Sequence, residues 1–205
     1  MQYKTEQEAF WAGDFGHEYV KRNVGSEIVA GNLALFSKVI RSAGKIESVI
    51  EYGPNIGMNL IALKQLLPKA ELAGVEINAG AAEKLRELGY VDVHQASILD
   101  FAPQNQYDLA FTKGVLIHIN PEALTQVYDL LYKSSRKYIL VAEYYNPVPV
   151  EISYRGHSGK LFKRDFAGEI MERFADLTLV DYGFSYHKDP SFPQDDITWF
   201  LLKKN

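Results

Sequence analysis

The 205-residue chain has room for one domain with a substantial core, and its 47% hydrophobic and 23% charged residues are ordinary for a globular protein. A net charge of −4 argues against a nucleic-acid binder, which usually carries a basic stripe, and the lack of cysteine excludes disulfides and thiolate metal sites. The sequence shows neither a signal peptide nor an apolar run of membrane-spanning length. We therefore expect a cytoplasmic protein without a membrane partner.

The first predicted elements are helices. Thr5 and Glu8 have the spacing of a capping box, which predicts a short helix. Ser26 precedes apolar residues at helical spacing, among them Phe36, and Gly44 is expected to end that second helix. Residues 1–44 are thus predicted to form an N-terminal helical cap on a core of residues 45–205.

Strands and helices then alternate along the chain. Strands are predicted at 48–52, 72–76, 91–94, 107–111 and 138–144, and helices at 58–67, 79–88 and about 120–134. This alternation predicts an α/β domain whose strands pair in parallel between two layers of helices. After a helix near 165–174, residues 177–186 and 197–203 are predicted to be two strands without a helix between them. They predict an antiparallel hairpin that completes a mostly parallel, seven-stranded sheet.

The turn after the first strand carries the first candidate site. The strand ends at Glu51, and Gly53 and Gly57 form the turn into a helix. Glycine lets the backbone approach a ligand closely. A dinucleotide site would need a third glycine, and Glu51 would repel a phosphate. An acidic residue here suits a cation, such as the amino group of a methionyl moiety. A glycine turn without a ligand is the alternative.

A second acidic residue, Glu76, ends the next strand, one strand-helix-strand unit later. A carboxylate at this place can accept hydrogen bonds from both hydroxyls of a ribose. An exposed glutamate at a strand end is the structural alternative. The spacing from Glu51 favours a shared ligand.

In this order, the segments EYGPNIG, GVEI, ASILD and YDLAFTKGVLIHINP resemble the motif series of class I S-adenosylmethionine-dependent methyltransferases. More narrowly, nearly the whole chain resembles the methylase family associated with pseudaminic acid biosynthesis. The residues that carry the narrower resemblance are Phe10-Trp11, Gly13, Phe15-Gly16, Tyr19, Arg22-Asn23, Glu143 to Pro147, Tyr154 to His157 and Leu161 to Asp165.

The resemblance implies a single-domain, Rossmann-like methyltransferase fold with S-adenosylmethionine as cofactor. It implies that Glu76, with Ile77 beside it, contacts the ribose, and that Ser97 and Ile98 face the adenine. Many class I enzymes carry an aspartate where Ser97 stands, which puts the adenine amino contact in doubt. The resemblance further places at the methionine end, or along the border of the cofactor, Glu51, Gly53, Asn55, Gly57, Lys113 and Gly114. For Ser97 and Lys113, a polar loop residue and a solvated lysine are the alternatives.

The early aromatic residues have two predicted roles. We expect Phe10 and Trp11 to pack the first helix onto the sheet. Tyr19, Arg22 and Asn23 are expected to follow a turn, and we expect Tyr19 and Arg22 to reach the cofactor carboxylate or the acceptor.

The acceptor is predicted to lie against the polar and aromatic loop 144–163. Its candidate substrate-binding residues are Tyr144, Tyr145, Arg155 and Lys163, because arginine suits a carboxylate or phosphate. A solvated basic loop is the alternative, above all for Lys163.

Two histidines are candidate general bases, which a hydroxyl acceptor would need. His157 lies in the predicted acceptor loop, whereas His118 lies in an apolar run and could be a packed structural residue. No histidines show metal-ligand spacing, so no metal is predicted.

The predicted function is methyl transfer to oxygen or nitrogen of a small polar acceptor, such as a sugar or nonulosonic acid derivative. An amino acid or other carboxylated metabolite is an alternative acceptor. A catalytically inactive, cofactor-binding regulator stays open, because binding and turnover need different residues. A nucleotide-dependent oxidoreductase is disfavoured by the missing third glycine and the terminal hairpin.

Overall fold

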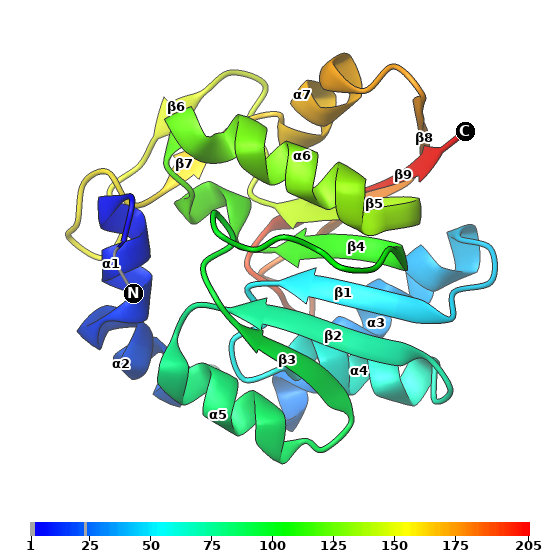
Figure 1. Ribbon diagram of the computed structural model, residues 1–205, viewed down its shortest axis with the longest axis horizontal. Coiled ribbons are helices and arrows are strands. Elements are labelled where there is room, and N and C mark those ends of the chain that lie inside the picture. The colour runs from blue at the N-terminus through cyan, green and yellow to red at the C-terminus, as the bar shows by residue number, and fades with distance from the viewer. Residues whose placement is uncertain (1–2, 23) are drawn as a thin grey trace.

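The computed structural model describes residues 3–22 and 24–205 and shows a seven-stranded sheet between helices (Figure 1). The strand order is β3-β2-β1-β4-β5-β9-β8. The strands are β1 (Ser48–Tyr52), β2 (Glu71–Glu76), β3 (Val91–Gln95), β4 (Tyr107–Lys113), β5 (Ser135–Glu143), β8 (Leu177–Ser185) and β9 (Ile197–Lys204). The first five pair in parallel.

The last two strands form the predicted antiparallel hairpin. β9 pairs antiparallel with both β5 and β8, so it lies between them although it follows both in the chain. The predicted fold, a mostly parallel seven-stranded sheet closed by an antiparallel hairpin, is confirmed.

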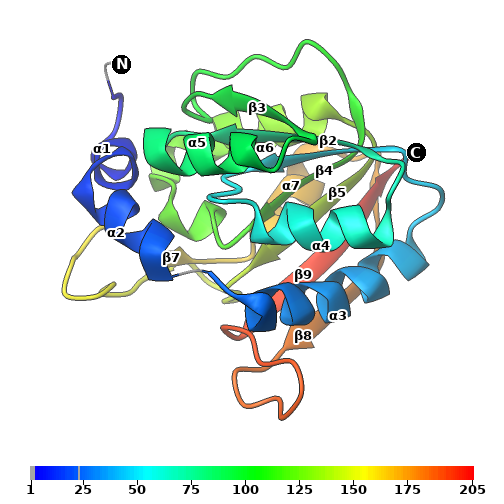
Figure 2. The same ribbon diagram turned by 90° about the horizontal axis from the view of Figure 1, so that it is seen from below.

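Helices cover both faces of the sheet (Figures 1 and 2). The cluster of buried side chains on one face draws on α3 (Ser26–Ser42) and α4 (Met58–Leu66), together with Leu85 of α5 (Ala79–Glu87). The cluster on the other face draws on α6 (Leu124–Ser134) and α7 (Phe166–Arg173). Every residue of β1 is buried, as expected for a strand covered on both faces.

Two more helices, α1 (Glu6–Ala12) and α2 (Asp14–Arg22), lie beyond the carboxyl ends of the parallel strands (Figure 1). The capping box of α1 is confirmed, with Thr5 and Glu8 both making their contacts. α2 was not predicted, because its sequence was interpreted as a turn before Tyr19. Asn23, which follows α2, lies outside the described residues.

The predicted acceptor loop is more ordered than expected. It contains a small hairpin of β6 (Val150–Glu151) and β7 (Phe162–Lys163), as well as an isolated bridge between Tyr154 and His157. Two 3-10 turns, η1 (Leu116–His118) and η2 (Pro121–Ala123), follow β4.

A buried carboxylate at the start of β4 links neighbouring segments at the end of the sheet away from α1 and α2. The Asp108 side chain is 1% exposed and accepts hydrogen bonds from the Glu47 amide at 2.8 Å and from the Arg136 guanidinium at 2.7 and 3.0 Å. The Lys137 ammonium lies 3.1 Å away. Although burial acts in the other direction, these donors hold the pKa of Asp108 below its usual range.

In the described part of the chain, no helix is long and apolar enough to cross a membrane.

Candidate functional site

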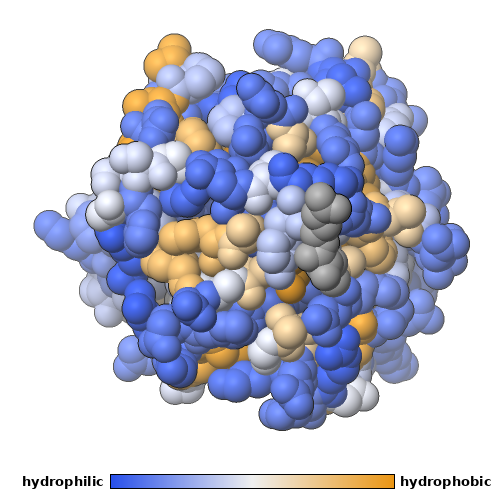
Figure 3. All heavy atoms as spheres, turned by 60° about the vertical axis from the view of Figure 1, so that its left-hand side comes forward, coloured by the Kyte–Doolittle hydropathy of each residue, from blue (hydrophilic) through white to orange (hydrophobic). Residues whose placement is uncertain are grey.

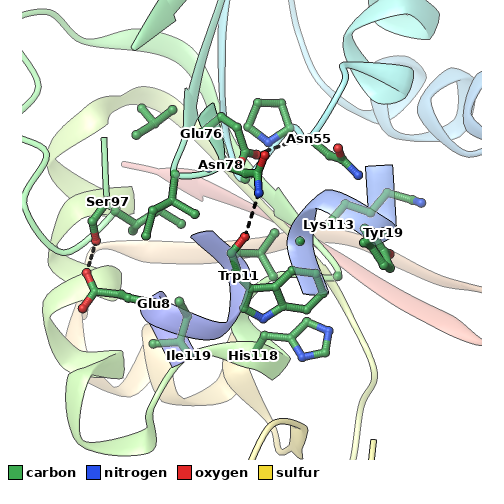
Figure 4. A pocket seen from close by; sticks show the side chains of 18 of the residues that line it. Glu8, Trp11, Tyr19, Asn55, Glu76, Asn78, Ser97, Lys113, His118 and Ile119 are labelled. Carbon is green, nitrogen blue, oxygen red and sulfur yellow. Dashed lines mark hydrogen bonds between the residues drawn. The ribbon is translucent and has the colours of Figure 1, made fainter. Parts of the chain in front are cut away.

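A cavity lies at the carboxyl ends of β1, β2 and β4, beneath α1 and α2 (Figure 4). Loops after four strands and side chains of the cap line it together. Nine of the twelve predicted cofactor residues are among its lining: Tyr19, Gly53, Asn55, Glu76, Ile77, Ser97, Ile98, Lys113 and Gly114. The other three, Arg22, Glu51 and Gly57, are not.

The glycine turn after β1 needs its unusual backbone. Gly53 has φ +76°, and a Cβ there would lie 2.7 Å from the Val115 side chain. Gly57, at φ +88°, begins α4, and a Cβ there would lie 2.6 Å from Leu85. Gly57 is therefore required by helix packing, whereas Gly53 borders the cavity. Asn55 also has a positive φ, +52°, which is uncommon outside glycine.

Glu51 is buried behind this turn. It is 0% exposed, and one carboxylate oxygen accepts a hydrogen bond from the Asn59 amide group at 2.6 Å. The other oxygen has no hydrogen-bond partner within residues 3–22 and 24–205. Burial raises the pKa of Glu51 to about 8, despite the opposing effects of Asn59 and the charge of Lys113. Asn59 lines the cavity, so Glu51 lies one side chain behind it.

Glu76 is held at the end of β2 by backbone donors. Its two oxygens accept hydrogen bonds from the amides of Asn55 and Asn78, each at 2.8 Å. Burial raises the pKa of Glu76, and these amides oppose the shift because they stabilise the carboxylate. The Asn78 side chain also ties the cap to this loop, since it donates to the Trp11 carbonyl at 3.1 Å.

A second carboxylate reaches the cavity from the cap. Glu8 on α1 accepts a hydrogen bond from the Ser97 hydroxyl, which follows β3 (Figure 4). Its other oxygen accepts from the amides of Lys4 at 2.7 Å and Thr5 at 2.8 Å. The capping box was predicted, but the contact to a residue 89 positions away was not.

Aromatic rings of the cap close the cavity on one side. The Trp11 ring lies 4.6 Å from the His118 ring and 5.1 Å from the Tyr19 ring. Trp11 lines the cavity, and its indole nitrogen has no hydrogen-bond partner in the described part of the chain. Trp11 therefore does more than pack α1 onto the core. Phe10, by contrast, stacks on Phe15 at 4.1 Å and does not line the cavity.

His118 enters the cavity from η1 with a defined tautomer. Its Nδ1 lies 2.6 Å from the Lys160 carbonyl oxygen. A carbonyl only accepts hydrogen bonds, so Nδ1 carries the proton and Nε2 is left as an acceptor. The ring is 7% exposed, and burial lowers its pKa to about 4. His118 is thus neutral at physiological pH.

Glu143, at the end of β5, fixes the loop that carries His118. It accepts hydrogen bonds from the amides of Val115 and Leu116, both at 3.1 Å, and of Ile117 at 3.5 Å. Burial raises its pKa to about 7 against the effect of these amides. This role of Glu143 was not predicted from the sequence.

Lys113 ends β4 at the far side of the cavity from Glu8 (Figure 4). Burial lowers its pKa, and the charges of Glu51, Asp195 and Glu143 oppose the shift. Lys113 is therefore not the solvated lysine that was the alternative interpretation.

Arg22 and His157 meet at a different place, a shallow hollow on the outside of the cap. The hollow is lined by Ala9, Phe10, Asp14, Phe15, Glu18, Arg22 and His157. Figure 3 shows this side of the molecule, with hydrophobic residues gathered between hydrophilic ones. Arg22 lies with Phe15 and Glu18, at i, i+3 and i+7 spacing, on the face of α2 that lines this outer hollow.

The four predicted substrate-binding residues do not line the cavity. The Lys163 ammonium lies 5.0 Å from the centre of the Tyr144 ring, and Tyr145 is 41% exposed beside Phe200. Arg155, at φ +50°, turns its guanidinium over the Tyr154 ring at 5.9 Å. The local hairpin and bridge hold these side chains along the loop. No group of three or more potential metal ligands comes together within the described residues.

Comparisons with known proteins identify the fold. No sequence-family model matches the chain, and no curated protein matches it. Solved structures match it over nearly its whole length. A 1,6-didemethyltoxoflavin-N1-methyltransferase from Burkholderia thailandensis, with bound 1,6-didemethyltoxoflavin and S-adenosylhomocysteine, shares 15% identity at a TM-score of 0.71, covering 100% of this chain and 92% of its own.

Two further structures are similar. Magnesium protoporphyrin IX methyltransferase from Synechocystis PCC 6803, with bound S-adenosylhomocysteine, shares 13% identity at a TM-score of 0.70 and covers 99% of this chain and 100% of its own. A plantazolicin methyltransferase, also in complex with S-adenosylhomocysteine, shares 13% identity at a TM-score of 0.66, with coverages of 97% and 94%. At such identities the likeness establishes the fold alone: the chain has the Rossmann-like fold found in these methyltransferases.

Proposed function

We propose that the protein binds S-adenosylmethionine in this cavity and transfers its methyl group to a small polar acceptor. The observation that carries the proposal is the order of chemical groups along the cavity (Figure 4). Ser97 and Glu8 lie at one end, Glu76 lies in the middle, and Lys113 and Tyr19 lie at the other end. A ligand with a purine, a ribose and a charged amino acid in series matches this order.

Unpartnered polar atoms support a polar ligand of this kind. Four atoms of cavity-lining residues are buried and have no hydrogen-bond partner in residues 3–22 and 24–205: Gln7 Oε1, Trp11 Nε1, Asn32 Nδ2 and Asn55 Oδ1. Buried polar atoms in proteins are nearly always hydrogen-bonded. A glycine turn with only a structural role would not explain four such atoms around one cavity.

The similar structures support the choice of ligand. The three methyltransferases described above were all crystallised with S-adenosylhomocysteine, the product that remains after methyl transfer. Their acceptors differ, so they support the methyl chemistry and not a particular acceptor.

In the proposed reaction, the bound cofactor supplies an activated methyl group on a cationic sulfur. The protein then mainly positions the two reactants. Trp11 and Tyr19 present aromatic faces that stabilise a nearby cation by about 0.5–2 kcal/mol. His118 presents an unprotonated Nε2 next to Trp11, which can accept the proton of an attacking hydroxyl group.

The acceptor is proposed to be small, and a sugar or nonulosonic acid derivative is the preferred class. α1 and α2 cover the cavity, which suits a small molecule better than a polymer. The resemblance of the sequence to a methylase family associated with pseudaminic acid biosynthesis supports the sugar class. An amino acid or other carboxylated metabolite is the alternative acceptor, so an acceptor panel must include both classes.

Calorimetry with S-adenosylhomocysteine tests the cofactor site. Glu76→Ala removes the proposed acceptor of two ribose hydroxyls and should weaken binding by about 10- to 150-fold, since one hydrogen bond to a charged group contributes about 1.5–3 kcal/mol. Glu71→Ala, at the exposed start of the same strand, is the matched control and should bind as the unaltered protein does. Equal affinities for all three proteins, or no binding at all, would refute the proposal.

Turnover is tested separately. The protein, S-adenosylmethionine and a panel of sugars, nonulosonic acids and amino acids are incubated, and S-adenosylhomocysteine is measured by mass spectrometry. A product that depends on the acceptor establishes an enzyme. Tight cofactor binding without product from any acceptor would favour the inactive regulator.

A further inference from the structure

The purine end of the cavity contains a carboxylate that comes from the cap and not from the sheet. Glu8 is 7% exposed, lines the cavity and accepts the hydroxyl hydrogen of Ser97. We propose that Glu8 recognises the 6-amino group of the purine, so that the N-terminal helix α1 sets the choice of base. This inference rests on the proposed function and deepens it.

The two oxygens of Glu8 have different roles. Oε2 accepts from the amides of Lys4 and Thr5 and from the Thr5 hydroxyl at 3.3 Å, so it is fully used in capping α1. Oε1 accepts only from Ser97 within the described residues. A carboxylate oxygen accepts about two hydrogen bonds, so Oε1 keeps one acceptor site next to the cavity.

Ser97 itself is poorly suited to reading an amino group. Its hydroxyl hydrogen is used on Glu8, and its oxygen already accepts from the Leu99 amide at 3.0 Å. Among the described residues that line this end, Glu8 is the acidic side chain with an acceptor site left. Hydrogen bonds to charged groups are stronger than those between neutral groups, so the carboxylate governs the preference.

The surroundings of Glu8 suit a flat, apolar ring system. Ile77, Ile98 and Leu99 line the same end of the cavity; Ile77 directly follows β2, and the other two lie in the loop after β3. With the ribose on Glu76, the base extends past Ile77 toward Ser97 and Glu8. An exocyclic amino group can donate a hydrogen to Oε1, whereas a 6-oxo group presents only an acceptor there and is repelled.

Capping and base recognition are therefore coupled through one side chain. α1 is further attached to the same loop by Lys4, whose ammonium lies 2.5 Å from Asp100 and 3.2 Å from the Leu99 carbonyl oxygen. Binding of the base stabilises this arrangement of α1, and loss of α1 order removes the base-reading carboxylate.

Calorimetry with S-adenosylhomocysteine and its 6-oxo analogue, S-inosylhomocysteine, tests the proposal. The unaltered protein should prefer the adenosyl compound by at least about tenfold, since one good hydrogen bond to a charge exceeds 1.4 kcal/mol. Glu8→Gln keeps a residue that completes a capping box but places an amide donor in the pocket. It should abolish or reverse the preference.

Glu6→Gln is the matched control, because Glu6 lies in the same first turn but outside the cavity. It should keep the preference of the unaltered protein. Ser97→Ala, which leaves Glu8 in place, should also keep the adenosyl preference even where affinity falls. This second variant decides the matter if Glu8→Gln does not fold.

The outcomes separate the inference from the function on which it rests. If the unaltered protein binds neither compound, the proposed function fails. If it binds S-adenosylhomocysteine but Glu8→Gln shows the same preference ratio, the role of Glu8 is refuted and the function stands. Loss of the preference in Ser97→Ala would assign base reading to Ser97 and overturn the proposal.

Discussion

The protonation state of Glu51 should change if a cation binds beside β1. Burial raises its pKa to about 8, so about nine-tenths of this carboxyl group is protonated at pH 7 without ligand. A nearby opposite charge lowers a carboxyl pKa by about 1–3 units. With a shift of about 2 units, binding of the amino group at pH 7 releases about 0.8 of a proton.

Because the pKa of Glu51 is lower in the complex, binding tightens as the pH rises toward about 8 and levels off above it. Calorimetry of S-adenosylhomocysteine binding in buffers of different ionisation enthalpy gives the number of protons released. Binding to the Glu51→Gln variant should release about 0.8 fewer protons. Binding to Glu47→Gln, altered at an exposed position, should release as many protons as binding to the unaltered protein. Equal proton release by the unaltered protein and Glu51→Gln would refute the reasoning.

Three further predictions concern catalysis, stability and metals. His118→Gln should lower kcat for a hydroxyl acceptor by about 10²–10⁴-fold with little change in cofactor Kd. In the pH profile of kcat for the unaltered enzyme, the acid limb should lie near pH 4. An unchanged kcat in His118→Gln would exclude His118 as the base. Asp108→Asn should lower the free energy of unfolding at pH 7 by about 2 kcal/mol in urea titrations. Because the folded pKa of Asp108 is lowered, its contribution is present above the unfolded pKa and is lost as the pH falls through the folded one, so the two proteins should converge in acid. Dialysis against EDTA should leave turnover unchanged, and a loss restored by magnesium would show that the metal prediction is wrong.

Local patterns were enough to predict most of the fold. The period of apolar residues and the breaks at Gly44, Pro68 and Gly89 gave helices and strands whose bounds differ from the structure by a few residues at most. The absence of a helix between 177–186 and 197–203 predicted the hairpin. These features depend on neighbouring residues, which a single sequence displays directly.

Side chains that reach the cavity from distant parts of the chain were harder to predict. Glu8 showed its capping role because its partner Thr5 is three residues away, but the contact with Ser97 depends on how the cap lies on the sheet. Asn78 was missed for the same reason, since it joins a strand-end loop to Trp11. α2 was missed because the residues before Tyr19 were interpreted as a turn.

The acceptor loop shows the opposite limitation. Its composition suggested a polar pocket, yet Lys163 packs over Tyr144 and Arg155 over Tyr154. Composition indicates which groups are available, but the direction of each side chain follows from the short hairpin β6–β7 and the Tyr154–His157 bridge.

The reversed direction of β9 has a practical consequence for handling the protein. Thr198, near its start, pairs with Glu143 at the end of β5, and Lys203, near its end, pairs with Tyr138 of β5 and Thr178 of β8, so residue 205 lies at the end of the sheet away from α1 and α2 (Figure 1). An affinity tag or surface tether attached after Asn205 would leave ligand access unobstructed. The same tether joined ahead of α1 would start at the cavity end of the molecule, near Thr5 and Glu8.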